Sequence, residues 1–451
     1  MARKFPMNNE KDSKAAFFFL FLYTASTLIR PHEMFQASVE WIVIKVFAII
    51  AFGLVLMVQR PLKLYPQHWM LLSLVPLIII SGFLNGSGMF GIEEAKMLLI
   101  SAIIPLFLMS TCITTIKRQH ILMVVCLIAA LLMVHNGHVQ QTAYEGFGWA
   151  LHTHSVGYID LGERRITYLG FFNDPNDLGM FLVMNLPFAM YFYSKGKFLI
   201  KLIMLAILCA LGYGIFLTGS RGSMLGAGGL IGIYLLVVNA GPKLFISVVL
   251  LAPIAATVIT SLQSSIDSSA NGRLEAWYAG IQMLMANPVF GVGKGRFYDH
   301  HGLVAHNSYI HVAGELGVPG YSLWGGALIF TVLTGYLFIK ASKLKKEAAA
   351  AESIINKDLN ENINEAFENE RLLNKTLFFS MIGFMITGFF ISRMFTLTLF
   401  IFMGMAIASH IRMVKVCPEY QEHFSSSPAL RSMGYCWVVI VAVYISLKLG
   451  L

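Results

Sequence analysis

The sequence has little charge for its length. Only 13% of its 451 residues are Asp, Glu, Lys or Arg, whereas soluble domains carry about a quarter. Hydrophobic residues make up 57% of the chain, and the mean hydropathy is +0.68. This balance argues against a soluble multidomain enzyme and predicts a chain whose length is used mainly for membrane spans.

Cysteine is also scarce, and its pattern excludes two classes of site. The five cysteines include no Cys-x-x-Cys pair, so neither a thiolate metal site nor an exported disulfide framework is expected. The basic residues give a formal net charge of +9. They form short clusters between apolar runs rather than one stripe, so we expect no nucleic-acid partner.

Long apolar runs are what the sequence has in abundance. Each run is long enough to suggest a membrane-spanning helix, and lipid tolerates no open sheet edges. We therefore predict an all-α polytopic membrane protein of about twelve transmembrane helices. The runs lie at 15–29, 40–57, 68–84, 97–113, 120–134, 178–193, 198–218, 223–239, 244–261, 318–339, 376–391 and 394–411. A thirteenth, at 434–447, is short for a span, so the side of the C-terminus stays open. The first run lacks a small-residue cleavage site, and we expect it to be retained.

The basic clusters indicate how the helices are oriented. With the N-terminus in the cytoplasm, successive clusters all fall on the cytoplasmic side, as the positive-inside rule expects. They are Arg60/Lys63, Lys117/Arg118, Lys195/Lys197/Lys201, Lys243, Lys340/Lys343/Lys345/Lys346 and Arg412/Lys415. Two long loops with short helices then lie outside, at 135–177 and 262–307. We divide the chain into N-terminal spans at 1–134, a core at 135–340, a charged cytoplasmic linker at 341–375 and C-terminal spans at 376–451.

Most basic residues left on the outer face are arginines. They are Arg30, Arg164, Arg165, Arg221, Arg273, Lys294, Arg296 and Arg393. A guanidinium group offers a planar fork of donors that suits phosphate oxygens and stays charged when half buried. An outer face rich in arginine predicts a bound anion such as a lipid phosphate or diphosphate.

Three segments carry candidate chemistry. The turn Gly219–Gly222 contains Arg221 and opens a helix, whose N-terminus attracts anions. The loop from Asn271 begins with an amphipathic helix that carries Arg273 and is suited to a membrane interface. His306-Asn307 is followed by nine residues and then Gly317-Val-Pro-Gly320, with His311 and Glu315 one helical turn apart.

A fourth segment runs from Arg164 and Arg165 to an Asn-Asp-Pro-Asn turn, after which Asn176 or Asp177 could cap the next span. Simpler roles stay open for all four segments. Arg221 could reach lipid headgroups, His306 could be structural, and the turn could serve only to begin a helix.

Together these segments resemble the O-antigen ligase and polymerase superfamily over residues 160–340. The ligase pattern has His, then Asn, Ser or Gln, nine residues, and Gly-x-x-Gly. His306, Asn307, Gly317 and Gly320 fit that pattern, and Arg164/Arg165, Arg221 and Arg273 match family positions.

The resemblance implies a glycosyltransferase of the bacterial inner membrane with its site facing the periplasm. The donor would be a glycan on undecaprenyl diphosphate. The acceptor would be lipid A-core for a ligase, which the His306 motif slightly favours, or a second lipid-linked glycan for a polymerase. We predict that His306 is the general base of an inverting transfer. Arg221, Arg273, Arg165 and Arg164 are assigned to the diphosphate, and Asn307, Glu315, His311 and Asn176 to orienting the substrate.

No cofactor or metal is expected, because the outer loops contain no Asp-x-Asp or carboxylate–histidine cluster of ligand type. A site in which Asp174 and Asp177 hold a cation makes the opposite prediction. The sequence also leaves open a protein hydroxyl as acceptor, a transporter of lipid-linked glycan and an intramembrane protease using Ser220. The ionisable residues cluster at one face, whereas transporters place them near the midplane. Ser220 also lacks a Gly-x-Ser-x-Gly pattern.

Overall fold

The computed structural model describes residues 11–143, 145–150, 153–156, 164–239, 254, 268–352 and 357–448, and within these ranges it contains helices but no β-strand. The first helices are α1 (Lys14–Leu28), α2 (Val43–Val58), α3 (Pro66–Leu84), α4 (Gly88–Leu98), α5 (Ile104–Cys112) and α6 (Ile116–Thr142). They are followed by α7 (Pro175–Lys195), α8 (Phe198–Leu217), α9 (Arg221–Asn239), α11 (Ser268–Ala286) and α12 (Phe297–His301). The last are α13 (Ser308–Glu352), α14 (Lys357–Gly388), α15 (Leu397–Val416), α16 (Ser426–Tyr435) and α17 (Trp437–Lys448).

Polar caps and prolines set where several helices begin. Ser13 Oγ accepts a hydrogen bond from Ala16 N at 3.0 Å at the start of α1, and Thr115 caps α6 in the same way. Pro66 and Pro175 occupy the first positions of α3 and α7. These residues satisfy or remove the backbone donors that a helix N-terminus leaves unpaired.

Among the described helices, seven are long and apolar enough to cross a membrane, and α1 and α2 are shorter apolar helices. The described chain is therefore an all-helical membrane protein, while the total of about twelve spans stays a prediction. The run expected at 244–261 lies outside the described residues apart from residue 254. The span expected at 97–113 begins earlier, at Gly88, because α4 continues through a π-helical segment, Leu99–Ile103, into α5.

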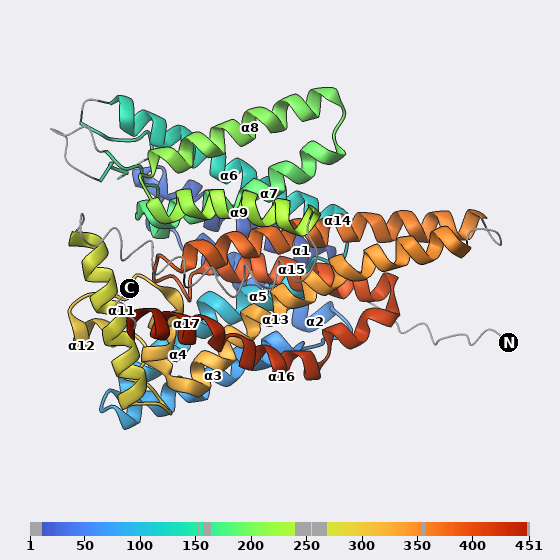
Figure 1. Ribbon diagram of the computed structural model, residues 1–451. Coiled ribbons are helices and arrows are strands. Elements are labelled where there is room, and N and C mark those ends of the chain that lie inside the picture. Colours follow the sequence, from blue (N-terminus) through green and yellow to red (C-terminus); the bar gives the residue numbers. More distant parts are fainter. Residues whose placement is uncertain are drawn as a thin grey trace.

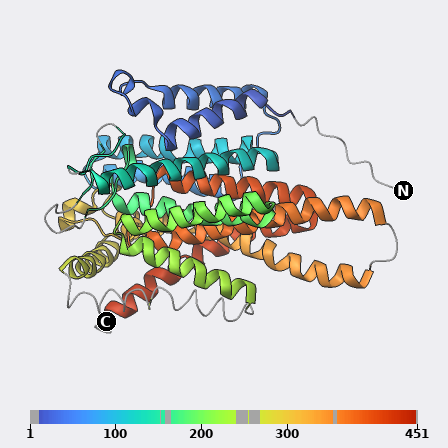
Figure 2. The same ribbon diagram turned by 90° about the horizontal axis from the view of Figure 1, so that it is seen from above.

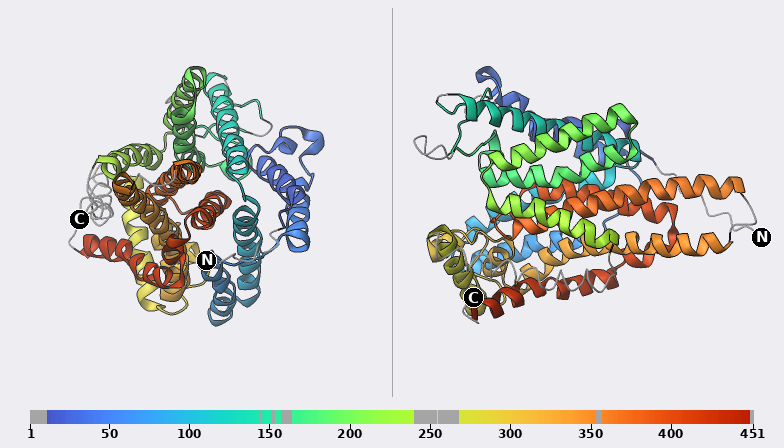
Figure 3. Two further views of the ribbon diagram at one scale, coloured as in Figure 1. Left: turned by 90° about the vertical axis from the view of Figure 1, so that its right-hand side faces the viewer. Right: turned by 45° about the horizontal axis from the view of Figure 1, so that its top comes forward.

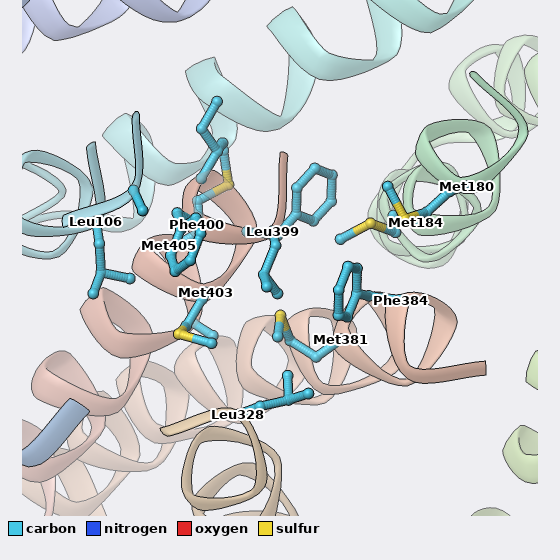
Figure 4. Close-up of a cluster of buried hydrophobic side chains, with 14 of the residues drawn as sticks. Leu106, Met180, Met184, Leu328, Met381, Phe384, Leu399, Phe400, Met403 and Met405 are labelled. Carbon is cyan, nitrogen blue, oxygen red and sulfur yellow. The ribbon is translucent and has the colours of Figure 1, made fainter. Parts of the chain in front are cut away.

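The centre of the bundle is formed by α14 and α15, with the other helices around them (Figure 3). In its most apolar stretch, 83% of α15 is buried, against 17% for α8, so α8 belongs to the periphery. Figure 4 shows the buried cluster in which Met180 and Met184 of α7 meet Met381 and Phe384 of α14. This core is lined by methionine and phenylalanine side chains, which fill irregular gaps between helices.

The two ends of the bundle hold different parts of the chain. At one end Lys11 pairs with Arg60 through backbone hydrogen bonds of 3.2 and 3.0 Å, and Asp12 forms an ion pair of 2.7 Å with Arg118. Arg412 donates to the Ile113 carbonyl at 2.8 Å at this end too. Three basic clusters predicted to share a side thus lie together, at the end where Figures 1 and 2 mark the N-terminus.

The C-terminal helices return along α13 to the opposite end. Thr334 of α13 lies near His423, whereas Tyr321, nearer the start of α13, donates to the Cys436 carbonyl at 2.8 Å. Helix α17 then reaches α11 (Figure 1). The weak apolar run at 434–447 is therefore part of a helical return, and α17 ends beside the loops described next.

Candidate functional site

Segments distant in sequence meet at the end of the bundle that carries α11 and α12. Ile166 N donates to the Leu217 carbonyl at 3.3 Å, which joins the end of the first outer loop to the end of α8. Ser308 Oγ donates to the Ile391 carbonyl at 2.6 Å, which joins the start of α13 to the connection between α14 and α15. The predicted candidate residues lie on these segments.

Arg165 is held in place by two hydrogen bonds. Its Nε donates to the Thr218 carbonyl at 2.8 Å, and its Nη2 donates to Asn176 Oδ1 at 3.1 Å. Burial lowers the pKa of Arg165, Asp174 counteracts that effect, and nearby Arg221 lowers the pKa further. Arg165 Cγ would lie 3.2 Å from a Cβ at Gly219, so Arg165 packs against the turn that carries Arg221.

Arg164 has a different environment from its neighbour. Its Nη1 donates to the carbonyls of Ala143 at 2.5 Å and Gln140 at 3.4 Å, where α6 ends. Basic side chains commonly bind the last carbonyls of a helix in this way. The structure thus places Arg164 at the end of α6 and Arg165 near Arg221, and a role for Arg164 on the diphosphate stays a prediction.

The cap of α7 differs from the sequence prediction. Asp174, rather than Asn176 or Asp177, is the N-cap, and its Oδ1 accepts from Asn176 N at 2.7 Å and Asn176 Nδ2 at 3.0 Å. Pro175 at the first helical position fixes this register. Asn176 is therefore free to orient Arg165 through its side-chain oxygen, so it acts on the site through that arginine.

Arg393 is a site residue that the sequence reasoning did not assign. Its Nε donates to Asp177 Oδ1 at 2.5 Å, and its Nη2 lies 3.4 Å from Asp174 Oδ2. Burial alone would lower the pKa of Arg393, but the two carboxylates raise it above its ordinary value. In the sequence, Arg393 was indicated only as one of the arginines predicted to lie on the outer face.

His306 occupies a strained backbone position immediately before α13. Its φ is +49°, a left-handed conformation that residues other than glycine seldom adopt and that occurs often at functional sites. Burial lowers the pKa of His306, as do Arg273, Arg393 and His311, while Asp174 raises it. The imidazole is thereby kept neutral near neutral pH.

Asn307 fixes His306 by capping α13. Its Oδ1 accepts from Tyr309 N at 3.0 Å and from Ile310 N at 3.1 Å, and the side chain is fully buried. The position after the histidine thus requires a side chain that can cap. A direct contact of Asn307 with substrate stays a prediction.

His311 and Glu315 face each other, as their spacing predicts. His311 Nε2 donates to Glu315 Oε1 at 3.0 Å, and Phe297 N donates to the same oxygen at 3.2 Å. Both residues are buried. The pair therefore ties α13 to the loop that precedes α12.

At the Gly-x-x-Gly motif, Gly317–Gly320, the glycine-rich loop at 291–295 packs against α13. Gly317 has φ +64° and ψ −167°, which breaks the helix, and Val318 N donates to the Pro288 carbonyl at 2.7 Å. A Cβ at Gly317 would lie 2.6 Å from that carbonyl oxygen. Gly293 N also donates to the Glu315 carbonyl at 2.9 Å. Only glycine fits at position 317.

The amphipathic helix α11 uses its apolar face inside the protein. Trp277, Ile281 and Leu284 are buried, and Trp277 Nε1 donates to the Ala305 carbonyl at 2.9 Å. The face expected to enter the membrane interface instead packs largely against α13. This packing holds Arg273, in the first part of α11, near His306.

Two observations limit the kind of site this can be: its possible metal ligands and the similarity of the chain to known proteins. Among the described residues, no group of three or more His, Cys, Asp or Glu side chains could hold a metal ion. No curated protein matches the chain. Residues 204–325, which include Arg221, Arg273 and His306, match the family model described as O-antigen ligase. The resemblance of this part of the chain to the O-antigen ligase and polymerase superfamily is therefore confirmed, while Arg164 and Arg165 lie outside the matched residues.

Proposed function

We propose that the chain is an inner-membrane glycosyltransferase that moves a glycan from undecaprenyl diphosphate to an acceptor hydroxyl on the periplasmic face. The arrangement of charged groups around Arg165 and His306 carries this proposal. Arg165 and Arg221 are neighbours, His306 and Arg273 are neighbours, and Asp174 acts on both Arg165 and His306. The candidate base thus has two arginines, Arg273 and Arg393, as electrostatic neighbours, and Asp174 acts on both His306 and Arg165 at the same end of the bundle. A cytoplasmic N-terminus and cytoplasmic linker at 341–375 belong to the same proposal.

The reaction is a direct displacement at the anomeric carbon of the donor sugar. His306 takes the proton of the acceptor hydroxyl as its oxygen bonds to that carbon. The bond from the carbon to the diphosphate oxygen breaks, and the diphosphate leaves with the bonding electrons. Arg165, Arg221 and Arg273 stabilise the negative charge that develops on it. Attack opposite the leaving group inverts the anomeric centre.

We place the ligase reaction, with lipid A-core as acceptor, slightly ahead of the polymerase reaction, because His306, Asn307 and the Gly317/Gly320 pair fit the ligase pattern. A deletion strain separates the two. Loss of a ligase leaves core without glycan while long lipid-linked glycan accumulates, whereas loss of a polymerase leaves single repeat units attached to the core. Normal glycan on the core, with an undecorated protein, would instead favour a protein acceptor.

The rate should depend on pH through His306. A general base must be neutral, and the pKa of His306 is lowered from its ordinary value of 6.5 by burial and by Arg273, Arg393 and His311, with Asp174 opposing. As pH falls, kcat/KM should hold through pH 6.5 and decline only below it, when the imidazole is protonated. Initial rates between about pH 5 and pH 8 test this. A decline centred above pH 6.5 would contradict the assignment.

Glycan transfer should not require a divalent metal. Arginines can balance the charge of a diphosphate, and Arg393 already binds both Asp174 and Asp177. Activity of the purified protein should survive EDTA and gain nothing from added magnesium or manganese. If chelation stops transfer, a divalent ion restores it and Asp174→Asn abolishes the rescue, the two aspartates hold a cation and the arginine-only site is wrong.

A further inference from the structure

A cavity of about 690 Å³ lies between the start of α13, the loop at 294–298 and the connection from α14 to α15. Its volume falls within the range of roughly 300–1,000 Å³ that is usual for small-molecule sites. His311 and Arg393, both electrostatic neighbours of His306, line it. Arg165, Arg221 and Arg273 are not among its described lining residues. His306 is not a lining residue either, but Val304, two residues before it, lines the cavity. The cavity therefore lies near the candidate base and is lined by Arg393, but not by the arginine cluster of Arg165, Arg221 and Arg273.

The cations that line this cavity already have partners. Lys294 forms an ion pair with Glu94, and its Nζ lies 5.0 Å from the centre of the Phe395 ring. Arg393 binds Asp177 at 2.5 Å. A bound anion would have to separate one of these pairs and leave a carboxylate poorly compensated. The cavity thus favours an uncharged ligand.

Several hydrogen-bonding atoms of the lining are unused. His311 Nε2 forms a hydrogen bond with Glu315 Oε1, which leaves Nδ1 as the second hydrogen-bonding atom of the ring. This Nδ1, Glu315 Oε2 and Ser392 Oγ are buried and have no hydrogen-bond partner among the described residues. His311 is only 7% exposed and Glu315 only 1%. Buried polar atoms of native proteins are normally paired, and a carboxylate oxygen, an imidazole nitrogen and a hydroxyl suit a ligand with adjacent hydroxyl groups, which can both donate and accept hydrogen bonds.

We infer that this cavity binds the sugar ring that presents the attacking hydroxyl, with Glu315 Oε2 and His311 Nδ1 forming hydrogen bonds with its other hydroxyls. The inference rests on the proposed function and assigns the acceptor to this cavity and the donor diphosphate to the arginine cluster. His306 has neighbours in both places, as a base that joins the two substrates requires. The ring belongs either to lipid A-core or to the end of a second lipid-linked glycan, and both offer the same hydroxyl chemistry.

Steady-state kinetics test the assignment with core-only lipopolysaccharide as acceptor and undecaprenyl-diphosphate-linked glycan as donor. Glu315→Gln should raise the KM for the acceptor by about 10- to 100-fold, and Ser392→Ala by about 2- to 10-fold. The KM for the donor and the kcat at saturating acceptor should stay within a few-fold of wild type. Ser409→Ala is the matched control, because Ser409 Oγ is also buried without a partner among the described residues but lies outside the cavity. A higher donor KM, or an unchanged acceptor KM, overturns the inference.

A thiol-protection experiment gives an answer that does not depend on activity. Thr396 lines the same cavity and is partly exposed. Thr396→Cys would be placed in a Cys209→Ser background, since Cys209 is the one exposed cysteine of five. The full protein in liposomes is treated with a small methanethiosulfonate reagent. Core oligosaccharide or deacylated repeat-unit glycan should suppress labelling, and whichever does so identifies the source of the acceptor. Undecaprenyl diphosphate should have no effect. Protection by undecaprenyl diphosphate alone, or by none of the three, contradicts the inference even if transfer itself is observed.

Discussion

Replacing His306 with alanine is expected to lower glycan transfer by about 10²- to 10⁴-fold, the usual contribution of a general base. Burial and the nearby Arg273, Arg393 and His311 lower the pKa of His306 while Asp174 opposes them, and this lowered pKa keeps the imidazole able to accept a proton. Expression and membrane insertion should stay near wild type, because the cap of α13 is supplied by Asn307. Initial rates in a reconstituted assay measure the effect.

Two further variants separate catalysis from backbone strain. His306→Asn removes the imidazole but keeps a residue that tolerates positive φ, so it should be as inactive as the alanine variant. His300→Ala removes an exposed histidine from the same loop and should retain full activity. Near-normal transfer by both His306 variants would end the assignment of a general base.

Substituting Arg221 or Arg273 should weaken transition-state stabilisation even when the charge is kept. Arginine to alanine is expected to reduce kcat by about 10²- to 10³-fold, the usual loss when one group that stabilises developing charge is removed. Lysine retains the charge but not the two-pronged donor geometry, so Arg221→Lys and Arg273→Lys should also lose a large part of the activity. Rates and binding of undecaprenyl diphosphate are measured together.

Arg296→Lys is the matched control for these substitutions. Arg296 lies in the same outer loop as Arg273 but forms an ion pair of 2.8 Å with Asp299 and lies over the Phe90 ring. Its replacement should change donor binding little. If the lysine and alanine variants of Arg221 and Arg273 all bind undecaprenyl diphosphate normally, the diphosphate is bound elsewhere.

The hydropathy of the sequence predicted most helices, but it did not predict where contacts with another segment make a helix longer. The expected span at 97–113 starts at Gly88 because a helix that carries Glu94 packs on the glycine-rich loop, where Lys294 pairs with that carboxylate. Polar residues interrupt the apolar run at this point, so a prediction from composition alone makes the helix too short. Similarly, the apolar face of α11 was visible in the sequence, but its partner, α13, was not.

The candidate site shows the same division between local and long-range information. The spacing of His311 and Glu315 sufficed to predict their contact, since one helical turn fixes it. The cap of α7 could also have been predicted, because Pro175 in the first turn places the N-cap at Asp174. The pairing of Asp177 with Arg393 joins residues 216 positions apart, and no local pattern indicates it.

The central claim is tested most directly by reconstituting the purified protein in liposomes with undecaprenyl-diphosphate-linked glycan and core-only lipopolysaccharide. The products are read by mass spectrometry, and movement of the donor lipid between leaflets is followed in parallel. We expect a new glycosidic bond to the acceptor and release of undecaprenyl diphosphate, without net translocation of the lipid. Translocation of the donor with no new glycosidic bond, on either the core or a second lipid-linked glycan, would contradict this claim.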